Sequence, residues 1–400
     1  MSIDAQSRPT EATGIVRWQM PALVVGVIGL VVAGIGAFTS PVEFFRAWLP
    51  AYIFWFHIAA GALGILMLQY VTGGEWGVVL RRPLGAAART IPLFFLFGLP
   101  VAFGLASVYL WADHDAVAHD PLLQAKTLWL NPTGWMIRSV IYLALLSIWA
   151  WRIRFLSIDF AKTRSPYTDA ARRRWSALGL PMFVLVLTFA GIDWVMSLEP
   201  KWYSSMFGIS FLVGAGLSAF AFSTMFLAAL SRNPAMSGIV KSGHLRDLGN
   251  LMLAFVLLWA YTAFSQFLLI WYGNLKEEVP YYLIRSRGIW GLIAAVLIVF
   301  HFFLPFTMLL MRRIKDDPRT ISIVAMLILV MRFVETYWLI GPAHHPSNFY
   351  FSWITLFAFL GIGGVWFFFF VQQLKGQTII PVHETWVEEA IRDGALTRNA

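Results

Sequence analysis

The chain has 400 residues, of which 59% are hydrophobic and only 13% charged, and its formal net charge is +9. A soluble domain cannot bury that much apolar surface, so the composition predicts an all-α polytopic membrane protein. The chain holds no cysteine, which excludes disulfides, thiolate metal sites and iron–sulfur ligation by its own residues.

Ten apolar stretches approach the length of about 20 residues that a helix needs to cross a bilayer. We expect spans at 19–38, 48–71, 91–111, 135–155, 176–197, 206–230, 248–272, 288–311, 320–340 and 352–373. The predicted organisation is therefore a cytoplasmic N-terminal segment over 1–18, a ten-helix membrane domain over 19–373 and a cytoplasmic C-terminal tail over 374–400.

Lysine and arginine gather in the connections on one side of these spans. The loop 156–175 and its helix edges are rich in both, whereas the opposite side holds only Arg46, Lys126, Lys201, Lys276, Arg285 and Arg287. The positive-inside rule then places both termini in the cytoplasm. The same asymmetry accounts for the positive net charge, so we expect lipids and no nucleic acid as partners.

One sizeable loop, 112–134, is expected on the far side, and it contains Asp113, His114, Asp115, His119 and Asp120. Histidine and carboxylate side chains can bind a metal. Exposed loops carry such residues far more often as solvated side chains, so we predict no metal site here.

The fifth and ninth spans end alike. Asp193 is followed seven residues later by Pro200, and Glu335 is followed seven residues later by Pro342. Both spans run outward, so the two acids are expected at matching depths. This match predicts parallel repeats, with spans 2–5 and 6–9 forming two four-helix bundles.

Ionisable residues inside a span are costly unless they are paired or face a wet cavity, which makes each one a functional candidate. The candidates for proton transfer are Asp193, Glu335, His57 and Arg332, and the candidates for binding a polar ligand are Arg138, Tyr142, Gln266 and Tyr261. All are expected in the extracytoplasmic half of the membrane. The structural alternative is that they pair between helices or extend to the interface.

A haem needs two axial ligands at one depth. His57 and His301 differ in expected depth by about 6 Å, which argues against a haem in this chain. The sequence also lacks the phosphate-binding loop, the His-Glu-x-x-His motif and the nucleophile elbow. Proton transfer, binding of an amphipathic ligand such as a quinol, and transport remain.

Three segments carry a family resemblance: "DWVMSLEPKWYSSMFGISFLVGAGLS" (193–218), "LGNLMLAFVLLWAYTAFSQFLLIWYGNLKEEVPYYLIRSRGIW" (248–290) and "HFFLPF" (301–306). With them the chain resembles the ActF family of membrane subunits of bacterial alternative complex III, a quinol:electron-acceptor oxidoreductase. It is also similar to ActC and to the NrfD/polysulfide-reductase-type membrane anchors. The resemblance extends over 19–373.

The resemblance implies a subunit of a respiratory complex in the bacterial inner membrane, rather than a catalyst acting alone. Its expected partners are ActC, the iron–sulfur subunit ActB, the multihaem cytochrome c ActA and small membrane subunits. Haem and iron–sulfur clusters would then lie in those partners, and quinol or menaquinol is the candidate ligand here. The family's acid at the end of the fifth span falls on Asp193.

Three functional hypotheses follow. The first is a membrane subunit that supports quinol oxidation and electron transfer to a cytochrome c or similar acceptor, with the polar residues serving proton transfer or quinol binding. The second is a structural anchor without a ligand of its own, in which those residues hold helices together. The third is a secondary transporter, whose site is expected on broken helices at the midplane.

Overall fold

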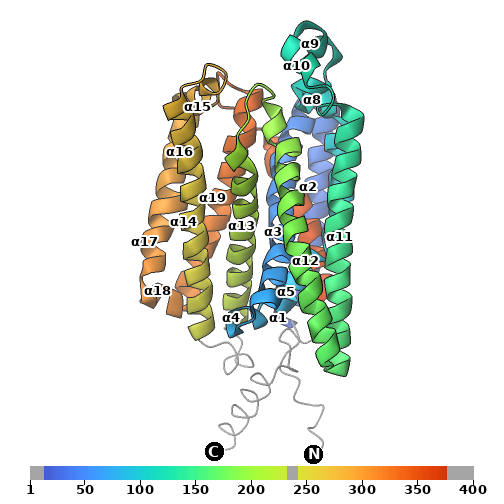
Figure 1. The fold of residues 1–400 in the computed structure, drawn as a ribbon, viewed down its shortest axis with the longest axis vertical. Helices are drawn as coiled ribbons and strands as arrows, with labels where there is room; N and C mark the ends of the chain where they lie inside the picture. The colour runs from blue at the N-terminus through green and yellow to red at the C-terminus, as the bar shows by residue number, and fades with distance from the viewer. Residues whose placement is uncertain (1–12, 232–241, 376–400) are drawn as a thin grey trace, which may run out of the picture.

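The computed structural model describes residues 13–231 and 242–375, and it forms no strand in these residues. Within them, nine helices are long and apolar enough to cross a membrane. They are α2 (Gln19–Thr39), α3 (Pro41–Thr72), α11 (Pro132–Thr163), α12 (Pro166–Trp194) with η2 (Met196–Leu198), α13 (Ser205–Ser231), α14 (Ser242–Gly273), α16 (Gly288–Val296) with η4 (Leu297–Phe303) and α17 (Leu304–Leu310), α19 (Pro318–His344) and α20 (Trp353–Leu374). The prediction of an all-α polytopic membrane protein is confirmed (Figure 1).

The expected third span, 91–111, is broken rather than continuous. It consists of the short helices α6 (Leu93–Phe97), α7 (Leu99–Phe103) and α8 (Leu105–Val108), and another short helix, α5 (Arg81–Ala88), precedes it. The segments Arg81–Ala88 and Leu93–Phe103 meet at 43° and count as a tenth span only if they are taken together. Pro92 and Pro100 interrupt the helical hydrogen bonding because proline has no backbone N–H.

Short helices connect the spans at the two ends of the molecule. They are α1 (Thr13–Val16), α4 (Glu75–Val78), η1 (Leu110–Ala112), α9 (His114–His119), α10 (Pro121–Ala125), α15 (Val279–Arg285) and α18 (Arg312–Asp316). Helices α1, α4, α5 and α18 lie at one end, which we call the basic end (Figure 1). Helices α8, α9, α10 and α15 lie at the other, which we call the loop end.

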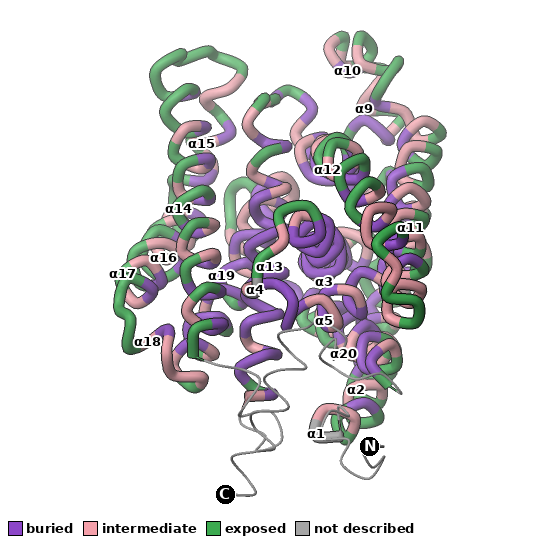
Figure 2. The backbone as a smooth tube through the Cα atoms, turned by 60° about the horizontal axis from the view of Figure 1, so that its bottom comes forward, coloured by how far each residue is buried: buried purple, intermediate pink, exposed green. Residues whose placement is uncertain are grey.

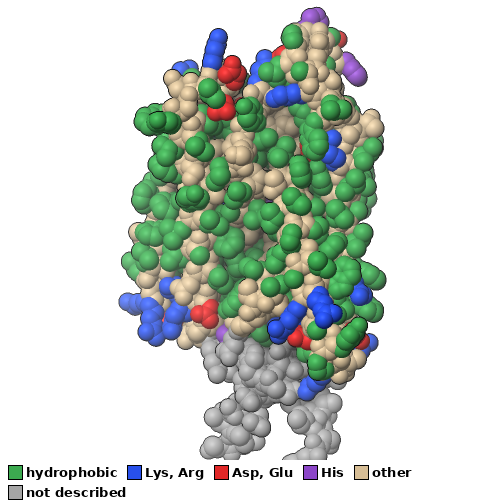
Figure 3. Space-filling view, viewed as in Figure 1, with side chains coloured by type: hydrophobic (Ala, Val, Ile, Leu, Met, Phe, Trp, Pro, Cys, Tyr) green, Lys and Arg blue, Asp and Glu red, His purple; other side chains and the backbone are tan. Residues whose placement is uncertain are grey.

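A wide hydrophobic belt separates the two ends, and most Lys and Arg side chains on the face shown gather at the basic end (Figure 3). The described chain also starts and finishes at the basic end (Figure 1). Gln19 at the start of α2 donates to the Phe368 carbonyl and to Gln372 near the end of α20, so the two ends of the described chain lie close together. This charge distribution agrees with the expected topology. The predicted cytoplasmic tail over 374–400 and the segment 1–18 lie largely outside the described residues.

The helices between α2 and α20 form two rings of the same order. In the first ring, α3 packs against α5 and α12, and α11 packs against α5 and α12. In the second, α13 packs against α14 and α19, and the span α16–η4–α17 packs against the same two helices. The equal order of contacts supports the repeat that the sequence predicts.

Helices α3 and α13 join the two bundles and are the most buried spans (Figure 2). Their backbones approach closely at Gly61, where an added Cβ would lie 2.0 Å from the Ala215 carbonyl oxygen. Small residues allow such contacts between membrane helices, whose association depends on packing rather than on the hydrophobic effect. The close approach places His57, one turn before Gly61 on α3, next to Phe211 on α13, with ring centroids 4.3 Å apart.

The first and last spans, α2 and α20, pack along each other through glycines. A Cβ at Gly29 would lie 2.6 Å from the backbone nitrogen of Gly361, and one at Gly364 would lie 2.4 Å from the Ala22 carbonyl oxygen. Because backbone rather than a flexible side chain occupies these positions, a larger residue cannot be accommodated by a rotamer change. Glycine therefore sets the distance between α2 and α20.

We expect Gly29→Val to separate α2 from α20. The free energy of unfolding should fall by about 1–3 kcal/mol, the usual cost of overpacking. Gly34→Val is the matched control, because Gly34 lies on the same helix and an added Cβ there meets nothing within 4 Å. The thermal unfolding midpoint of each purified variant in detergent checks this. Equal midpoints for the two variants would contradict a packing role for Gly29.

Candidate functional site

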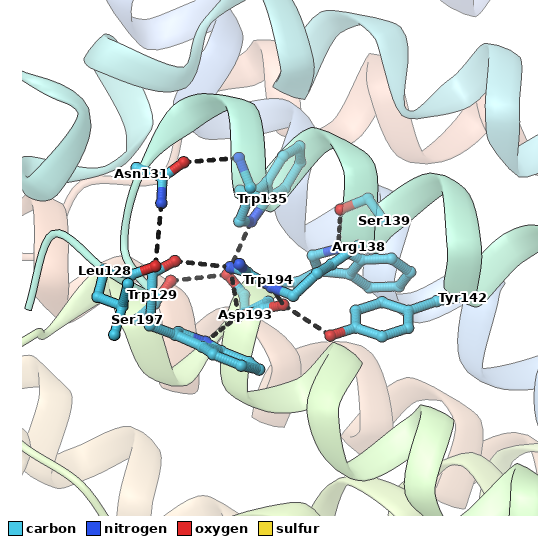
Figure 4. Close-up of polar contacts among 11 residues, drawn as sticks. Leu128, Trp129, Asn131, Trp135, Arg138, Ser139, Tyr142, Asp193, Trp194 and Ser197 are labelled. Atoms are coloured by element: carbon cyan, nitrogen blue, oxygen red, sulfur yellow. Dashed lines mark hydrogen bonds and ion pairs between the residues drawn. The ribbon is translucent and has the colours of Figure 1, made fainter.

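Asp193 is fully buried, and its carboxylate is surrounded by donors from α11 and the segment before it (Figure 4). Oδ1 accepts a hydrogen bond from Trp129 Nε1 at 2.9 Å. Oδ2 accepts from Arg138 Nε at 2.7 Å and from the Tyr142 hydroxyl at 2.8 Å. A second guanidinium nitrogen of Arg138 donates to Oδ1 at 3.2 Å. We call this group, with Trp135 and Ser197, the Asp193 clamp.

The backbone of Asp193 is held as firmly as its side chain. Its carbonyl accepts hydrogen bonds from Trp135 Nε1 at 2.9 Å and from Ser197 Oγ at 2.6 Å. The Arg138 guanidinium also lies over the Trp129 ring, 4.2 Å from its centroid, and donates to the Trp129 carbonyl. Both oxygens of a buried carboxylate are thus satisfied by charge-assisted or neutral hydrogen bonds, as a stable buried charge requires.

The two acids that the sequence pairs occupy different positions on their helices. Helix α12 ends at Trp194, one residue after Asp193 and before Pro200. Helix α19 continues through Pro342 to His344, so Glu335 lies nine residues from its end. The two acids are thus equally far from a proline in the sequence, but the helix ends before that proline in one case and continues through it in the other.

Glu335 belongs to a second polar group, the Glu335 cluster, which consists of His57, Ser218, Trp259, His301, Arg332 and Glu335. Glu335 Oε1 accepts a hydrogen bond from Trp259 Nε1 at 2.7 Å, and Oε2 pairs with Arg332 one turn earlier on α19. Arg332 also donates to Ser218 Oγ at 3.4 Å. This buried ion pair thus joins α13, α14 and α19, and α3 is added through His57.

Arg332 fixes the tautomer of His57. The guanidinium is only a donor, and it lies 3.2 Å from His57 Nδ1, so Nδ1 must be the acceptor. A neutral His57 ring then carries its hydrogen on Nε2, which has no hydrogen-bond partner among the described residues. Gly214 provides the space for Arg332, since a Cβ there would lie 2.2 Å from the guanidinium.

His301 lies on the other side of Glu335. It belongs to the π-helix η4, and its Nδ1 is 3.7 Å from Glu335 Oε2. Its ring also packs on Trp259, with centroids 4.2 Å apart. Single turns of π-helix within α-helices are frequent at functional sites, and here the turn brings a fully buried imidazole next to a carboxylate.

A cavity of about 840 Å³ lies beside the Glu335 cluster and contains His57, Arg332 and Glu335 in its wall. Four residues of the wall each carry one buried side-chain atom without a hydrogen-bond partner in the described structure: His57 Nε2, Ser210 Oγ, Gln266 Oε1 and Arg285 Nε. Buried polar atoms are normally hydrogen-bonded, so each exception needs an explanation. These residues, together with Arg332 and Glu335, give one part of the cavity wall a polar lining.

The rest of the cavity wall is mostly apolar and reaches the outer surface of the helices. It includes residues of α14 that are exposed in the isolated chain, among them Phe264, Trp271 and Tyr261, which is 63% exposed. The wall also includes Tyr282 on α15, whose hydroxyl accepts from Gln266 Nε2 at 3.3 Å. Burial raises the pKa of Tyr282 to about 12, so its hydroxyl stays protonated near neutral pH. A ligand with a polar head and an apolar body matches this lining.

Helix α15 closes the cavity at the loop end and is fastened to the first bundle. Arg285 donates to Glu199 Oε1 at 2.6 Å and to the Leu339 carbonyl at 2.9 Å. Beside this ion pair, Trp202 stacks on Tyr281 with centroids 3.8 Å apart. The segment after η2 thus holds the wall of the cavity in place.

The structure brings the predicted residues together as two groups rather than one. Asp193, Arg138 and Tyr142 form the clamp, and His57, Arg332 and Glu335 form the cluster, with Gln266 and Tyr261 on the cavity wall. Among the described residues, no hydrogen bond or ion pair joins the two groups. The sequence interpretation did not include Trp259, Ser210 and Arg285 as site residues and placed His301 apart, although His301 opens the segment "HFFLPF".

Two aspartates of the loop end, Asp113 and Asp120, have structural partners. Asp113 and Asp120 accept the hydrogen bonds that begin α9 and α10, and Asp120 pairs with Lys201 at 2.8 Å. The hydrogen bond from Lys201 lowers the pKa of Asp120. No group of three His, Asp or Glu residues in 13–231 and 242–375 is arranged to hold a metal ion.

Comparison with known proteins gives no family assignment: no protein-family model matches the chain, and no curated protein matches it.

Proposed function

We propose that this chain is a membrane subunit of a quinol-oxidising respiratory complex of the alternative complex III type, and that its large cavity binds the quinol. The observation that carries this proposal is the cavity whose wall combines a polar part, with His57, Arg332, Glu335 and Gln266, and an apolar part that reaches the outer surface of the helices. A quinol has hydroxyl groups at its ring and an apolar tail, which are the two features that such a wall recognises.

The Glu335 cluster suits the oxygen chemistry of a quinol. His57 Nε2–H, oriented by Arg332, can donate to a ring oxygen, and the Glu335 carboxylate also lies on the cavity wall. A quinol that is oxidised releases two electrons and two protons. We propose that Glu335 accepts the two protons in turn and passes the first to His301 before it takes the second, while the two electrons leave to haem or iron–sulfur centres in partner subunits.

Two alternatives fit the described residues less well. A transporter is expected to build its site on broken helices, but no residue of α5–α8 lines the described cavity. A purely structural role fits the Asp193 clamp, in which every acceptor position of the carboxylate is filled. The Glu335 cluster differs from the clamp, because three of its residues, His57, Arg332 and Glu335, line the cavity.

We expect His57→Leu to weaken quinol binding by about 10–100-fold, because one hydrogen bond to a buried group contributes about 1–3 kcal/mol. Binding of a water-soluble quinol analogue to the complex purified from native membranes measures this. His57→Gln, which can present an amide N–H at the same place, is expected to retain part of the affinity. His119→Leu in the loop-end helix α9 is the control and should bind as the unchanged protein does.

Equal binding by His57→Leu and the control would overturn the placement of the quinol in this cavity. The same preparation tests the complex itself, because haem and iron–sulfur spectra must accompany the chain. Purification without them would contradict the assignment to a quinol-oxidising complex.

A further inference from the structure

Two guanidinium groups converge on one residue at the basic end. Arg89, between α5 and α6, donates to the Gln373 carbonyl at 2.7 Å, and Arg154 on α11 donates to Gln373 Oε1 at 3.2 Å. Both arginines are half-buried. Three segments far apart in the sequence therefore meet at Gln373, beside two cations, and we call this place the Gln373 site.

Positive charge gathers at the Gln373 site. Arg154 and Arg82 both lie near enough to Arg89 to act on it electrostatically. No carboxylate of the described residues forms an ion pair with Arg89 or Arg154, whereas other arginines near this end, such as Arg172 and Arg246, have an aspartate partner. Like charges held together in a partly buried place repel each other unless an anion balances them.

The position of Arg154 along α11 indicates which anion could balance these cations. Trp151 and Phe155, on either side of Arg154 in the sequence, are 63% and 52% exposed and stack on each other. Large exposed apolar rings on a membrane helix face lipid. The cations thus lie at the edge of the apolar belt, where an anion attached to a hydrocarbon chain is present at high local concentration.

We propose that Arg89 and Arg154 bind the phosphate of an anionic phospholipid. The planar guanidinium matches phosphate oxygens in a bidentate manner, and basic pockets between membrane helices on the cytoplasmic side are known lipid headgroup sites. The acyl chains then cover the Trp151 and Phe155 side of α11. This site is separate from the quinol cavity and does not depend on it.

The test is the thermal unfolding midpoint of the full chain in detergent, with phosphatidylglycerol or phosphatidylcholine added to the micelles. We expect phosphatidylglycerol to raise the midpoint above the phosphatidylcholine value, and Arg154→Gln to remove most of that difference. Arg154→Lys, which keeps the charge, should retain part of it. Arg174→Gln is the control, because Arg174 is an exposed arginine near the same end.

A third arm adds inorganic phosphate without lipid, and no rise is expected. An equal rise with inorganic phosphate would overturn the lipid assignment in favour of a free anion. An undiminished phosphatidylglycerol effect in Arg154→Gln would show that lipid charge acts elsewhere on the surface. Native mass spectrometry of the same variants, in which Arg154→Gln should lose a retained phosphatidylglycerol, keeps the test valid if the variant is less stable from the start.

Discussion

Glu335→Gln is expected to destabilise the protein by about 3–5 kcal/mol, the cost of removing one partner of a buried ion pair. The substitution leaves the Arg332 guanidinium buried among Ser218 and His57 without a counter-charge. It also removes the carboxylate that we propose as the proton acceptor on the cavity wall, so quinol turnover of the complex should be lost. Thermal unfolding and turnover of the purified complex measure the two effects.

A second variant separates the two effects of Glu335. Replacing the pair together, with Arg332→Met and Glu335→Leu, removes both buried charges and should recover most of the stability. Turnover should stay lost, because neither the carboxylate nor the orientation of His57 returns. Recovery of both properties would show that the pair is only a structural connection. Asp316→Asn at the partly exposed pair with Arg246 is the control and should cost no more than about 1 kcal/mol.

Asp193→Ala is expected to have a comparable effect on stability, about 3–5 kcal/mol, without a specific effect on the quinol cavity. It leaves Arg138 without its counter-charge and removes the acceptor of Trp129 and Tyr142. Because these donors belong to α11 and the segment before it, that part of the first bundle should loosen first. The thermal midpoint and quinol-analogue binding at a temperature below it check both statements.

Two comparisons make the Asp193 result decisive. Asp113→Ala removes an exposed capping aspartate of the same loop end, and should cost about 1 kcal/mol. Asp193→Asn keeps the shape of the side chain but places an amide among donors. If Asp193→Asn abolished turnover while the midpoint stayed unchanged, Asp193 would be a proton-transfer residue and not a clamp.

The long spans could be predicted from the sequence because apolar length is a local property. Helix α2 begins and ends within one residue of the expected 19–38. The break in the third span was harder to predict from the sequence. Pro92 and Pro100 signal irregularity, but where the helix bends depends on the neighbours that receive its freed backbone groups.

The members of the site could be named from the sequence, but their grouping could not. Hydropathy gives the depth of a residue such as His57 and says nothing about the direction in which its side chain points. The direction is especially hard to predict on α3. Nearly all faces of this helix are buried, so no apolar stripe marks a side that faces lipid. The contact between His301 and Glu335 also depends on the π-helix η4, which changes the direction in which the side chains of that turn point.

The contact between α2 and α20 has a consequence for biosynthesis. Helix α2 packs chiefly on α20, which the ribosome makes after all the other described spans. Until α20 is made, α2 lies in the bilayer with α3 as its main partner among the described helices. A chain truncated before Trp353 would leave the glycine face of α2 uncovered, and quality-control proteases in the membrane would have a simple way to distinguish unfinished chains from complete ones.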